Sequence, residues 1–226
     1  MKVVKNEDRE LYQCEECGFR YAEKEWAEKC EAWCREHKSC NIEIAAHAFP
    51  QLEIAVLGGG CFGCTEAVFL QLKGVGSVVS GYAGGSVLNP TYDQVSGGKT
   101  GHAEVIKIEY DPAVIQFHKL LEVFFASHDP TTPDRQGPDV GSQYRSILLY
   151  TTKQQREEAE RHIKELTAAG KYGRPIVTEI APLTAFYPAE EYHQRYYERN
   201  PNVPYAEAVI KPKVEKVKKE FGDSSL

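Results

Sequence analysis

The 226-residue sequence lacks several features that would point to common classes of protein. It has no run of the roughly 20 apolar residues that a membrane-spanning helix needs. Its charged N-terminus has no apolar core of the kind found in signal peptides. It has no excess of positive charge, because 27 basic and 33 acidic residues leave a net charge of −6. We therefore expect a cytoplasmic protein that binds neither nucleic acid nor membranes.

Cysteine is absent after residue 64, although the chain contains seven cysteines. Five of them crowd the first forty residues, and the other two are Cys61 and Cys64. Thiols are kept reduced in the cytoplasm, so we interpret these cysteines as metal ligands or redox groups and not as a disulfide scaffold. The cysteine-rich N-terminal part ends near Pro50, a residue that commonly interrupts regular structure. This change predicts a small module over residues 1–47 and a catalytic domain over 48–226.

The first module has the cysteine spacing of a zinc site. A CxxC knuckle points two sulfurs at one ion, and two further cysteines four residues apart share one face of a predicted helix over 23–37. A module this small cannot fold on apolar burial alone, so a structural zinc ion would supply much of its folding free energy. The pattern predicts a ββα zinc-finger-like module with the ligands Cys14, Cys17, Cys30 and Cys34.

Alternatives to this zinc site remain open. His37 or Cys40 could replace Cys34 as the fourth ligand, and iron in a rubredoxin-like site or free redox thiols could replace zinc. Residues 1–47 contain eight Lys/Arg and eleven Asp/Glu. Since a DNA-binding finger normally has a basic face, we expect a structural cap or a protein-docking module.

Strand and helix patterns alternate in the larger domain. They predict an α/β fold class, a two-layer, ferredoxin-like α+β arrangement with a mixed or antiparallel sheet covered by helices. Predicted strands cover 52–57, 75–82, 102–110, 145–150 and 176–180. Predicted helices cover 64–72, 114–127, 153–166 and 190–198, and a long Pro/Gly-rich loop covers 129–141.

The glycine-rich run over 58–64 lies where the first predicted strand meets a helix. Three glycines let the backbone turn tightly and approach a substrate closely. A thiol at Cys61 would lie near the free amides and the positive dipole end of that helix, which favour the thiolate near neutral pH. Cys64 is one helical turn away, within reach of a disulfide with Cys61. The pair predicts redox or nucleophilic chemistry; a buried structural CxxC or half of a metal site is the alternative.

Seven motifs in order carry a resemblance to a known family. They are Gly60-Cys61-Phe62-x-Cys64-x-Glu66, Gly81-Tyr82-Ala83-Gly84-Gly85, Pro90-Thr91-Tyr92, Thr100-Gly101-His102-Ala103-Glu104-Val105, His128-Asp129-Pro130-Thr131, Asp139-x-Gly141-Ser142-Gln143-Tyr144-Arg145-Ser146 and Glu191-Tyr192-His193-Gln194. Over about residues 52–221 the chain resembles the peptide-methionine (S)-S-oxide reductases, the methionine sulfoxide reductase A family.

This resemblance implies an enzyme that reduces the S epimer of methionine sulfoxide, free or in oxidised proteins. It implies that Cys61 attacks the sulfoxide sulfur and that Glu104 protonates the oxygen, since a carboxyl in an apolar pocket has a raised pKa. The sulfenic acid formed on Cys61 would then condense with a nearby thiol. No organic cofactor is implied, and a thioredoxin-like dithiol would reduce the disulfide. The substrate-binding residues implied are Phe62, Tyr92, Asp139 and Tyr144.

Two departures from the family pattern bear on activity. Gly63 stands where the family places a tryptophan that packs against the substrate methyl group. Either another aromatic side chain fills the gap or the pocket accepts a bulkier sulfoxide. Tyr196 is a separate candidate for lining the pocket. No cysteine follows residue 64, so Cys64 is the simplest resolving thiol, with an N-terminal or external thiol as the alternative. His102, His128 and His193 are expected to be structural hydrogen-bonding groups.

Two other functions remain as alternatives. One is a thiol–disulfide oxidoreductase or redox sensor on the same scaffold, and the other is a zinc-binding adaptor with an inactive reductase domain. The presence of Glu104 and Asp139 favours the reductase, because a disulfide exchanger needs neither carboxyl group.

Overall fold

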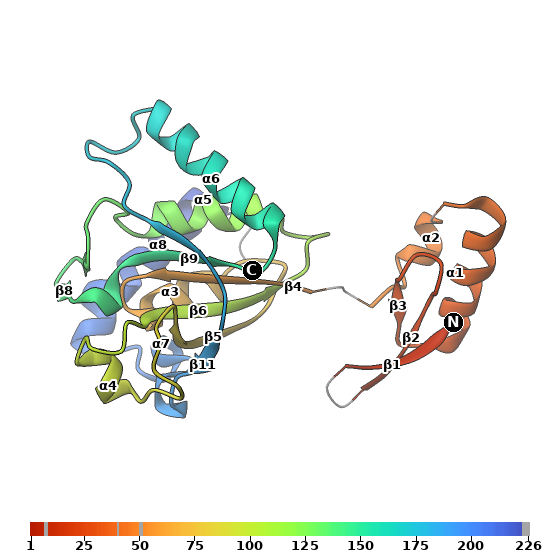
Figure 1. Ribbon diagram of the computed structural model, residues 1–226, viewed down its shortest axis with the longest axis horizontal. Coiled ribbons are helices and arrows are strands. Elements are labelled where there is room, and N and C mark those ends of the chain that lie inside the picture. Colours follow the sequence, from red (N-terminus) through yellow and green to blue (C-terminus); the bar gives the residue numbers. More distant parts are fainter. Residues whose placement is uncertain (7–8, 40, 50–51, 223–226) are drawn as a thin grey trace. The chain divides into compact units, whose positions relative to one another are not determined.

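The computed structural model describes residues 1–6, 9–39, 41–49 and 52–222. The chain forms two compact units, Met1–Leu52 and Glu53–Leu226 (Figure 1). Cys40, one of the alternative metal ligands, lies outside the described residues. Among the residues that are described, no helix is both long enough and apolar enough to cross a membrane.

The first unit is a small antiparallel sheet with one long helix. The sheet has the order β1-β2-β3. Its core is small and contains the buried side chains of Tyr21 and Ala27 together with cysteine sulfurs. The helix predicted over 23–37 is present as α1. The elements are β1 (Lys2–Asn6), β2 (Arg9–Gln13), β3 (Arg20–Tyr21), α1 (Lys24–His37) and α2 (Ile42–Ala45).

The second unit is built on a six-stranded sheet of order β10-β9-β4-β6-β5-β11. Strands β9 and β10 are parallel and the other neighbours are antiparallel. This mixed sheet with helices confirms the predicted fold class. The strands are β4 (Glu53–Gly59), β5 (Val75–Ala83), β6 (Ala103–Tyr110), β9 (Ser146–Tyr150), β10 (Glu179–Pro182) and β11 (Phe186–Pro188).

The two faces of this sheet belong to different apolar clusters. Side chains alternate across a strand, so Leu57 and Ile106 contribute to the large core with the helices, and Val56 and Val105 to a smaller one. Figure 1 shows α5, α6 and α8 gathered beside the sheet. The helices are α3 (Phe62–Phe69), α4 (Tyr92–Ser96), α5 (Phe117–Ser127), α6 (Lys153–Ala168), α7 (Tyr196–Arg199) and α8 (Lys211–Glu220).

Several short elements differ from the sequence-based expectation. The long loop over 129–141 contains a hairpin of β7 (Arg135–Gln136) and β8 (Asp139–Val140). The helix predicted over 190–198 is divided into a 3₁₀ turn and α7, because Arg195 between them adopts a left-handed backbone conformation with φ 52°. A π-helical turn, Ala206–Ile210, leads directly into α8. These deviations from regular structure all lie near the site described next.

Candidate active site

Cys61 lies at the junction of the central strand β4 and helix α3. Gly60 makes the turn with a left-handed φ of 95°, and a Cβ atom there would lie 2.6 Å from the side chain of Gln136. The position therefore requires glycine. Cys61 is the N-cap residue of α3, and its carbonyl accepts hydrogen bonds from the amides of Cys64 and Thr65 at 3.1 and 3.3 Å.

Cys61 opens into a cavity of about 280 Å³. The cavity brings Cys61 together with all the other residues that the resemblance implicated in proton transfer and substrate binding. Cys64 is 1 % exposed and is absent from the cavity wall, so Cys61 is the sulfur that a substrate can reach. The lining residues are Cys61, Phe62, Gly63, Tyr92, Glu104, Asp139, Tyr144, His193, Tyr196 and Tyr205.

Glu104 supplies a buried carboxyl group to this cavity. It lies on β6, opposite Tyr82 of β5, and is 2 % exposed. Its Oε2 atom accepts a hydrogen bond from the backbone amide of Phe62 at 3.1 Å. Burial, with smaller contributions from the neighbouring Cys61 and Asp139, raises the pKa of Glu104 to about 9. Glu104 is therefore a neutral acid at pH 7, able to donate a proton.

The two thiols form a hydrogen-bonded pair. The hydrogen bond from Cys61 lowers the pKa of Cys64 to about 7, with the positive charge of Lys213 also contributing. The same hydrogen bond and burial raise the pKa of Cys61. In the resting pair the lower pKa belongs to Cys64, so the Cys61 thiolate expected from the helix N-terminus stays a prediction. Transfer of one proton from Cys61 to Cys64 would place the negative charge on the sulfur that faces the cavity.

Tyr92 and Tyr144 direct phenol groups into the cavity from separate segments. Tyr92 begins α4, and its amide donates a 2.8 Å hydrogen bond to Glu190. Tyr144 ends a 3₁₀ turn, Ser142–Tyr144. Burial raises the pKa of both tyrosines, which keeps them neutral. Among the described residues neither hydroxyl has a hydrogen-bond partner, so both are available as donors to a ligand.

Tyr196 lies against Gly63, the position where the family tryptophan is missing. The three atoms nearest to a Cβ placed on Gly63 would all belong to Tyr196, with the Cβ of that tyrosine at 3.4 Å and its ring from 3.7 Å. The backbone amide of Tyr196 donates to Glu66 at 3.2 Å. Glu66 is 1 % exposed, and burial raises its pKa. A buried carboxyl on α3 therefore fixes the start of α7 and with it the aromatic ring beside Gly63.

The three histidines divide into two kinds. His102 and His128 each hydrogen-bond through both ring nitrogens, to Gly85 and Val87 and to Phe124 and Ser146. These two are structural, as expected. His193 instead packs its ring against Phe62, Tyr92 and Tyr192 at 5.0, 4.4 and 4.2 Å between centroids. Its Nε2 atom is buried without a partner in the described chain.

Sequence reasoning missed Tyr205 and gave His193 no place in the cavity. Tyr205 comes just before the π-helical turn, and its hydroxyl donates to Asp139 at 3.2 Å and lies 3.6 Å from the Cys64 sulfur. The available signal was the aromatic residue in the segment Pro204-Tyr205-Ala206.

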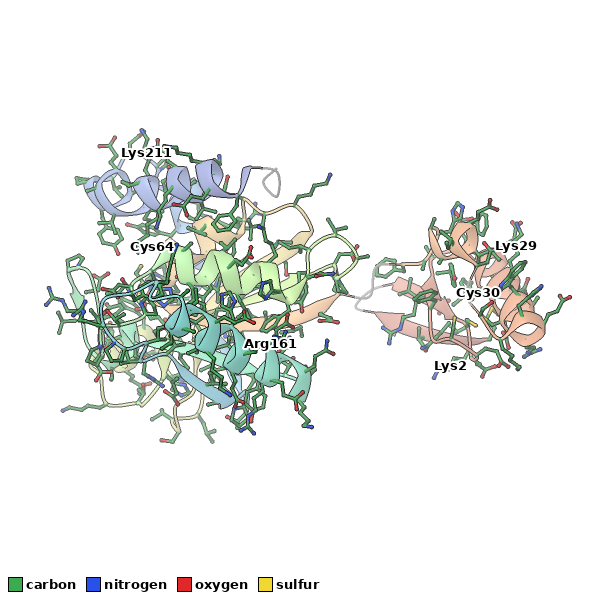
Figure 2. The ribbon with its side chains drawn as sticks, turned by 90° about the horizontal axis from the view of Figure 1, so that it is seen from above. Lys2, Lys29, Cys30, Cys64, Arg161 and Lys211 are labelled. Atoms are coloured by element: carbon green, nitrogen blue, oxygen red, sulfur yellow. The ribbon has the colours of Figure 1, made fainter. Side chains whose placement is uncertain are left out.

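The first unit contains a separate cluster of thiols. The sulfurs of Cys14, Cys17, Cys30 and Cys34 lie within 4.8 Å of one another. The Cys17–Cys30 and Cys30–Cys34 sulfurs are 3.4 and 3.9 Å apart. Four sulfurs at about 2.3 Å from one tetrahedral zinc ion would lie roughly 3.8 Å from each other. The donor set therefore fits zinc; Figure 2 labels Cys30 of this cluster.

His37 has a different environment. It stacks on Trp33 at 3.8 Å, with its Nδ1 atom 3.2 Å from the Trp33 carbonyl oxygen, and it is not part of the thiol cluster.

Comparisons with known proteins agree with the geometry of the cavity. The sequence profile of the family described as peptide methionine sulfoxide reductase matches residues 53–225, and the first unit lies outside this match. A Sulfolobus acidocaldarius protein named peptide methionine sulfoxide reductase MsrA is 55% identical over 174 residues, 77% of this chain and 98% of its own. A Halobacterium salinarum protein of the same name is 55% identical over 170 residues, 75% of this chain and 96% of its own.

Solved structures give the same result. Methionine sulfoxide reductase A of Corynebacterium diphtheriae is 36% identical with a TM-score of 0.62, and the match covers 70% of this chain and 80% of that one. Mxr1 of Saccharomyces cerevisiae in its reduced form is also 36% identical with a TM-score of 0.62, covering 67% of this chain and 87% of that one.

Proposed function

Because the chain belongs to the peptide methionine sulfoxide reductase family, we propose that the cavity around Cys61 reduces the S epimer of methionine sulfoxide, free or protein-bound. The observation that carries this proposal is the buried carboxyl of Glu104, whose pKa is raised by burial, in one cavity with the Cys61 thiol and the phenols of Tyr92 and Tyr144. A sulfoxide oxygen leaves sulfur only when it is protonated. An exchanger of thiols and disulfides has no use for such an acid.

In the first step the oxygen atom moves from the substrate to the enzyme. Cys61 passes its proton to Cys64 and attacks the sulfoxide sulfur, while Glu104 protonates the oxygen. The products are methionine and a sulfenic acid on Cys61, so the substrate gains two electrons and Cys61 loses two. The hydroxyls of Tyr92 and Tyr144 hold the oxygen by hydrogen bonds, with Asp139 ordering the site.

The apolar part of the substrate requires a wall on the side of Gly63. Phe62 and Tyr196 supply aromatic surface there, the second in place of the tryptophan that the family has at position 63. Glu66 stabilises this arrangement through the amide of Tyr196. A buried aromatic wall contributes about 1–3 kcal/mol to binding of the transition state.

In the second step Cys64 condenses with the sulfenic acid. The S–O bond of Cys61 breaks, an S–S bond forms, and the hydroxide leaves with the Cys64 thiol proton as water. A dithiol reductant of the thioredoxin class then exchanges with the Cys61–Cys64 disulfide and restores both thiols. No organic cofactor takes part in this sequence.

Turnover of the separate S and R epimers with dithiothreitol tests the proposal. We expect the wild type to produce methionine from the S epimer only, and Cys61→Ser to produce none. Cys30→Ser in the other unit is the matched control and should retain turnover. The proposal is refuted if the wild type does not turn over the S epimer, or if Cys61→Ser is as active as the wild type.

For the first unit we propose a structural zinc ion held by Cys14, Cys17, Cys30 and Cys34. The support is the mutual approach of four sulfurs in a unit whose apolar core is small. A metal content of one zinc per chain that disappears in a Cys14→Ser/Cys30→Ser variant is the expected result. Iron in place of zinc, or no metal, would contradict the proposal. The cytoplasm as the compartment of the protein remains a prediction.

A further inference from the structure

Tyr205 is a cavity residue to which the proposed reaction so far gives no role. Its hydroxyl lies between two groups with different tasks. It donates to Asp139 Oδ2 at 3.2 Å, on the side of the substrate oxygen, and it lies 3.6 Å from Cys64 Sγ, on the side of the resolving thiol. A phenol has one proton, so it can donate to only one of these groups at a time.

We propose that Tyr205 is a positioning residue for disulfide formation, and that its hydroxyl turns its single hydrogen bond from Asp139 to Cys64 when the Cys64 thiolate attacks the oxidised Cys61. The inference rests on the proposed function. It adds to that function a hydrogen-bond donor, the Tyr205 hydroxyl, that acts in the second step, the formation of the disulfide.

The surroundings of Cys64 support this role. Cys64 is buried, and a buried thiolate needs a hydrogen-bond donor or a positive charge close by. In the resting pair Cys61 is that donor. Once Cys61 carries the oxygen its thiol proton is gone, whereas the Tyr205 hydroxyl still lies 3.6 Å from Cys64 Sγ and can donate to it. The charged and titratable groups that act on Cys64 are Cys61, Tyr205, Lys213 and Asp139.

The backbone around Tyr205 also holds its hydroxyl in a defined position relative to Cys64. It lies just before the π-helical turn Ala206–Ile210, and π-helical turns are frequent at functional sites. This turn connects to α8, which contacts α3, the helix of Cys64. Figure 2 shows Cys64 and the Lys211 end of α8 on the same side of the second unit. Packing of α8 on α3 therefore fixes the Tyr205 hydroxyl relative to Cys64.

The chemistry of the step balances without a further reactant. Cys64 loses its proton and its sulfur attacks the Cys61 sulfur; the S–O bond breaks as the S–S bond forms. The departing hydroxide combines with the proton from Cys64 and leaves as water. The Cys64 sulfur is oxidised and the Cys61 sulfur is reduced. Tyr205 loses no atom in this step; its donated hydrogen bond stabilises the thiolate that the step requires.

A single-turnover experiment separates the two halves of the reaction. Reduced full-length enzyme is mixed with excess free methionine (S)-sulfoxide without reductant and quenched at successive times. Methionine is counted, dimedone traps the sulfenic acid on Cys61, and peptide mapping measures the Cys61–Cys64 disulfide. In Tyr205→Phe we expect methionine to form within about twofold of the wild-type rate, and the disulfide to form roughly tenfold more slowly. Trapped sulfenic acid should accumulate.

The matched control is Tyr172→Phe, which removes the hydroxyl of another half-buried tyrosine, one that donates to the Phe125 carbonyl outside the cavity. It should change neither step. Disulfide formation at the wild-type rate in Tyr205→Phe, or equal slowing of both steps, would overturn the inference. A wild type that forms no methionine would instead overturn the proposed function itself, so the two failures are distinguishable.

A second measurement does not depend on turnover. The difference in thiolate absorbance at 240 nm between Cys61→Ser and Cys61→Ser/Cys64→Ala, followed against pH, reports the ionisation of the buried Cys64. Tyr205→Phe should move the midpoint of this titration upward by about one pH unit. Asp139→Asn should move it downward, and by less when Tyr205 is already phenylalanine, because the freed hydroxyl can no longer turn to Cys64. Equal effects of Asp139→Asn in both backgrounds would show simple charge repulsion and contradict the shared proton.

Discussion

Replacing Glu104 by glutamine should stabilise the protein while removing its activity. The unfolded glutamate is ionised at pH 7, whereas burial raises the pKa of Glu104 in the folded protein to about 9. Folding must therefore take up a proton. The cost is about 1.4 kcal/mol for each pH unit above the ordinary glutamate pKa of 4.5, which is roughly 3 kcal/mol at pH 7. Glutamine has no such cost, and its carbonyl oxygen can still accept the hydrogen bond from Phe62.

The direction of the Glu104 pKa shift determines how the stability difference between Glu104→Gln and the wild type changes with pH. Because the folded pKa is raised, the carboxyl destabilises the fold increasingly as pH rises from 4.5 towards 9. The free-energy advantage of Glu104→Gln should grow by about 1.4 kcal/mol per pH unit across that window. Denaturant unfolding at pH 5.5, 7.0 and 8.5 measures it. Both tryptophans lie in the first unit, as Trp26 and Trp33. Near-ultraviolet circular dichroism of the tyrosines is therefore the suitable probe for the second unit.

The control for this experiment is Glu157→Gln, an exposed substitution on α6 that should give a small difference without a trend in pH. A stability difference for Glu104→Gln that stays constant from pH 5.5 to 8.5 would refute the reasoning, since it would mean that Glu104 is ionised in the folded protein. Turnover of the same variant should fall about 10²- to 10⁴-fold through loss of the acid. Wild-type turnover should decline as pH rises through about 9.

Four further predictions concern other parts of the chain. Gly63→Trp should lower kcat/KM because its ring would displace Tyr196, whereas Gly63→Ala should be tolerated; higher activity of the tryptophan variant would contradict this packing. Cys64→Ser should still form one methionine per chain without reductant, measured by rapid quench, and a Cys61–Cys64 disulfide should be absent from its peptide map. A chelator that removes the proposed zinc ion should unfold the first unit, seen as a red shift of tryptophan fluorescence, and leave reductase turnover in place. Burial lowers the pKa of His162, so the neutral ring loses its contribution to stability as pH falls below about 6.5. The free energy of unfolding of His162→Leu should therefore fall less steeply than that of the wild type when the pH is lowered below that value.

The sequence predicted the parts of the molecule where pattern and chemistry are local. Short apolar stretches predicted β4 and β6, and the spacing of four cysteines predicted the thiol cluster in the first unit. Seven ordered motifs predicted the family. These signals depend on residues close together in the chain or on a shared pattern, and the structure and the comparisons agree with them.

What the sequence could not show depends on side chains that meet across the fold. The pKa of Cys61 depends on its hydrogen bond with Cys64 and on burial, which reasoning from the helix N-terminus did not include. Tyr196 could be suggested as a pocket residue, but its place against Gly63 depends on a hydrogen bond to Glu66, 130 residues away in sequence. The contact of Tyr205 with Cys64 spans 141 residues. No local pattern encodes such distances.

The two steps of the reaction use parts of the fold that are stabilised by different interactions. The two reacting groups of the first step, Cys61 and Glu104, lie just after β4 and on β6. These are neighbouring strands inside the sheet, where hydrogen bonding on both sides gives opening free energies close to that of global unfolding. Tyr205 stands on the C-terminal segment, which is held mainly by side-chain packing and can open while the sheet stays intact. Opening of this segment alone would leave a protein that still reduces one sulfoxide. Such an enzyme would fail by stalling as a sulfenic acid after a single use, with its sheet still folded.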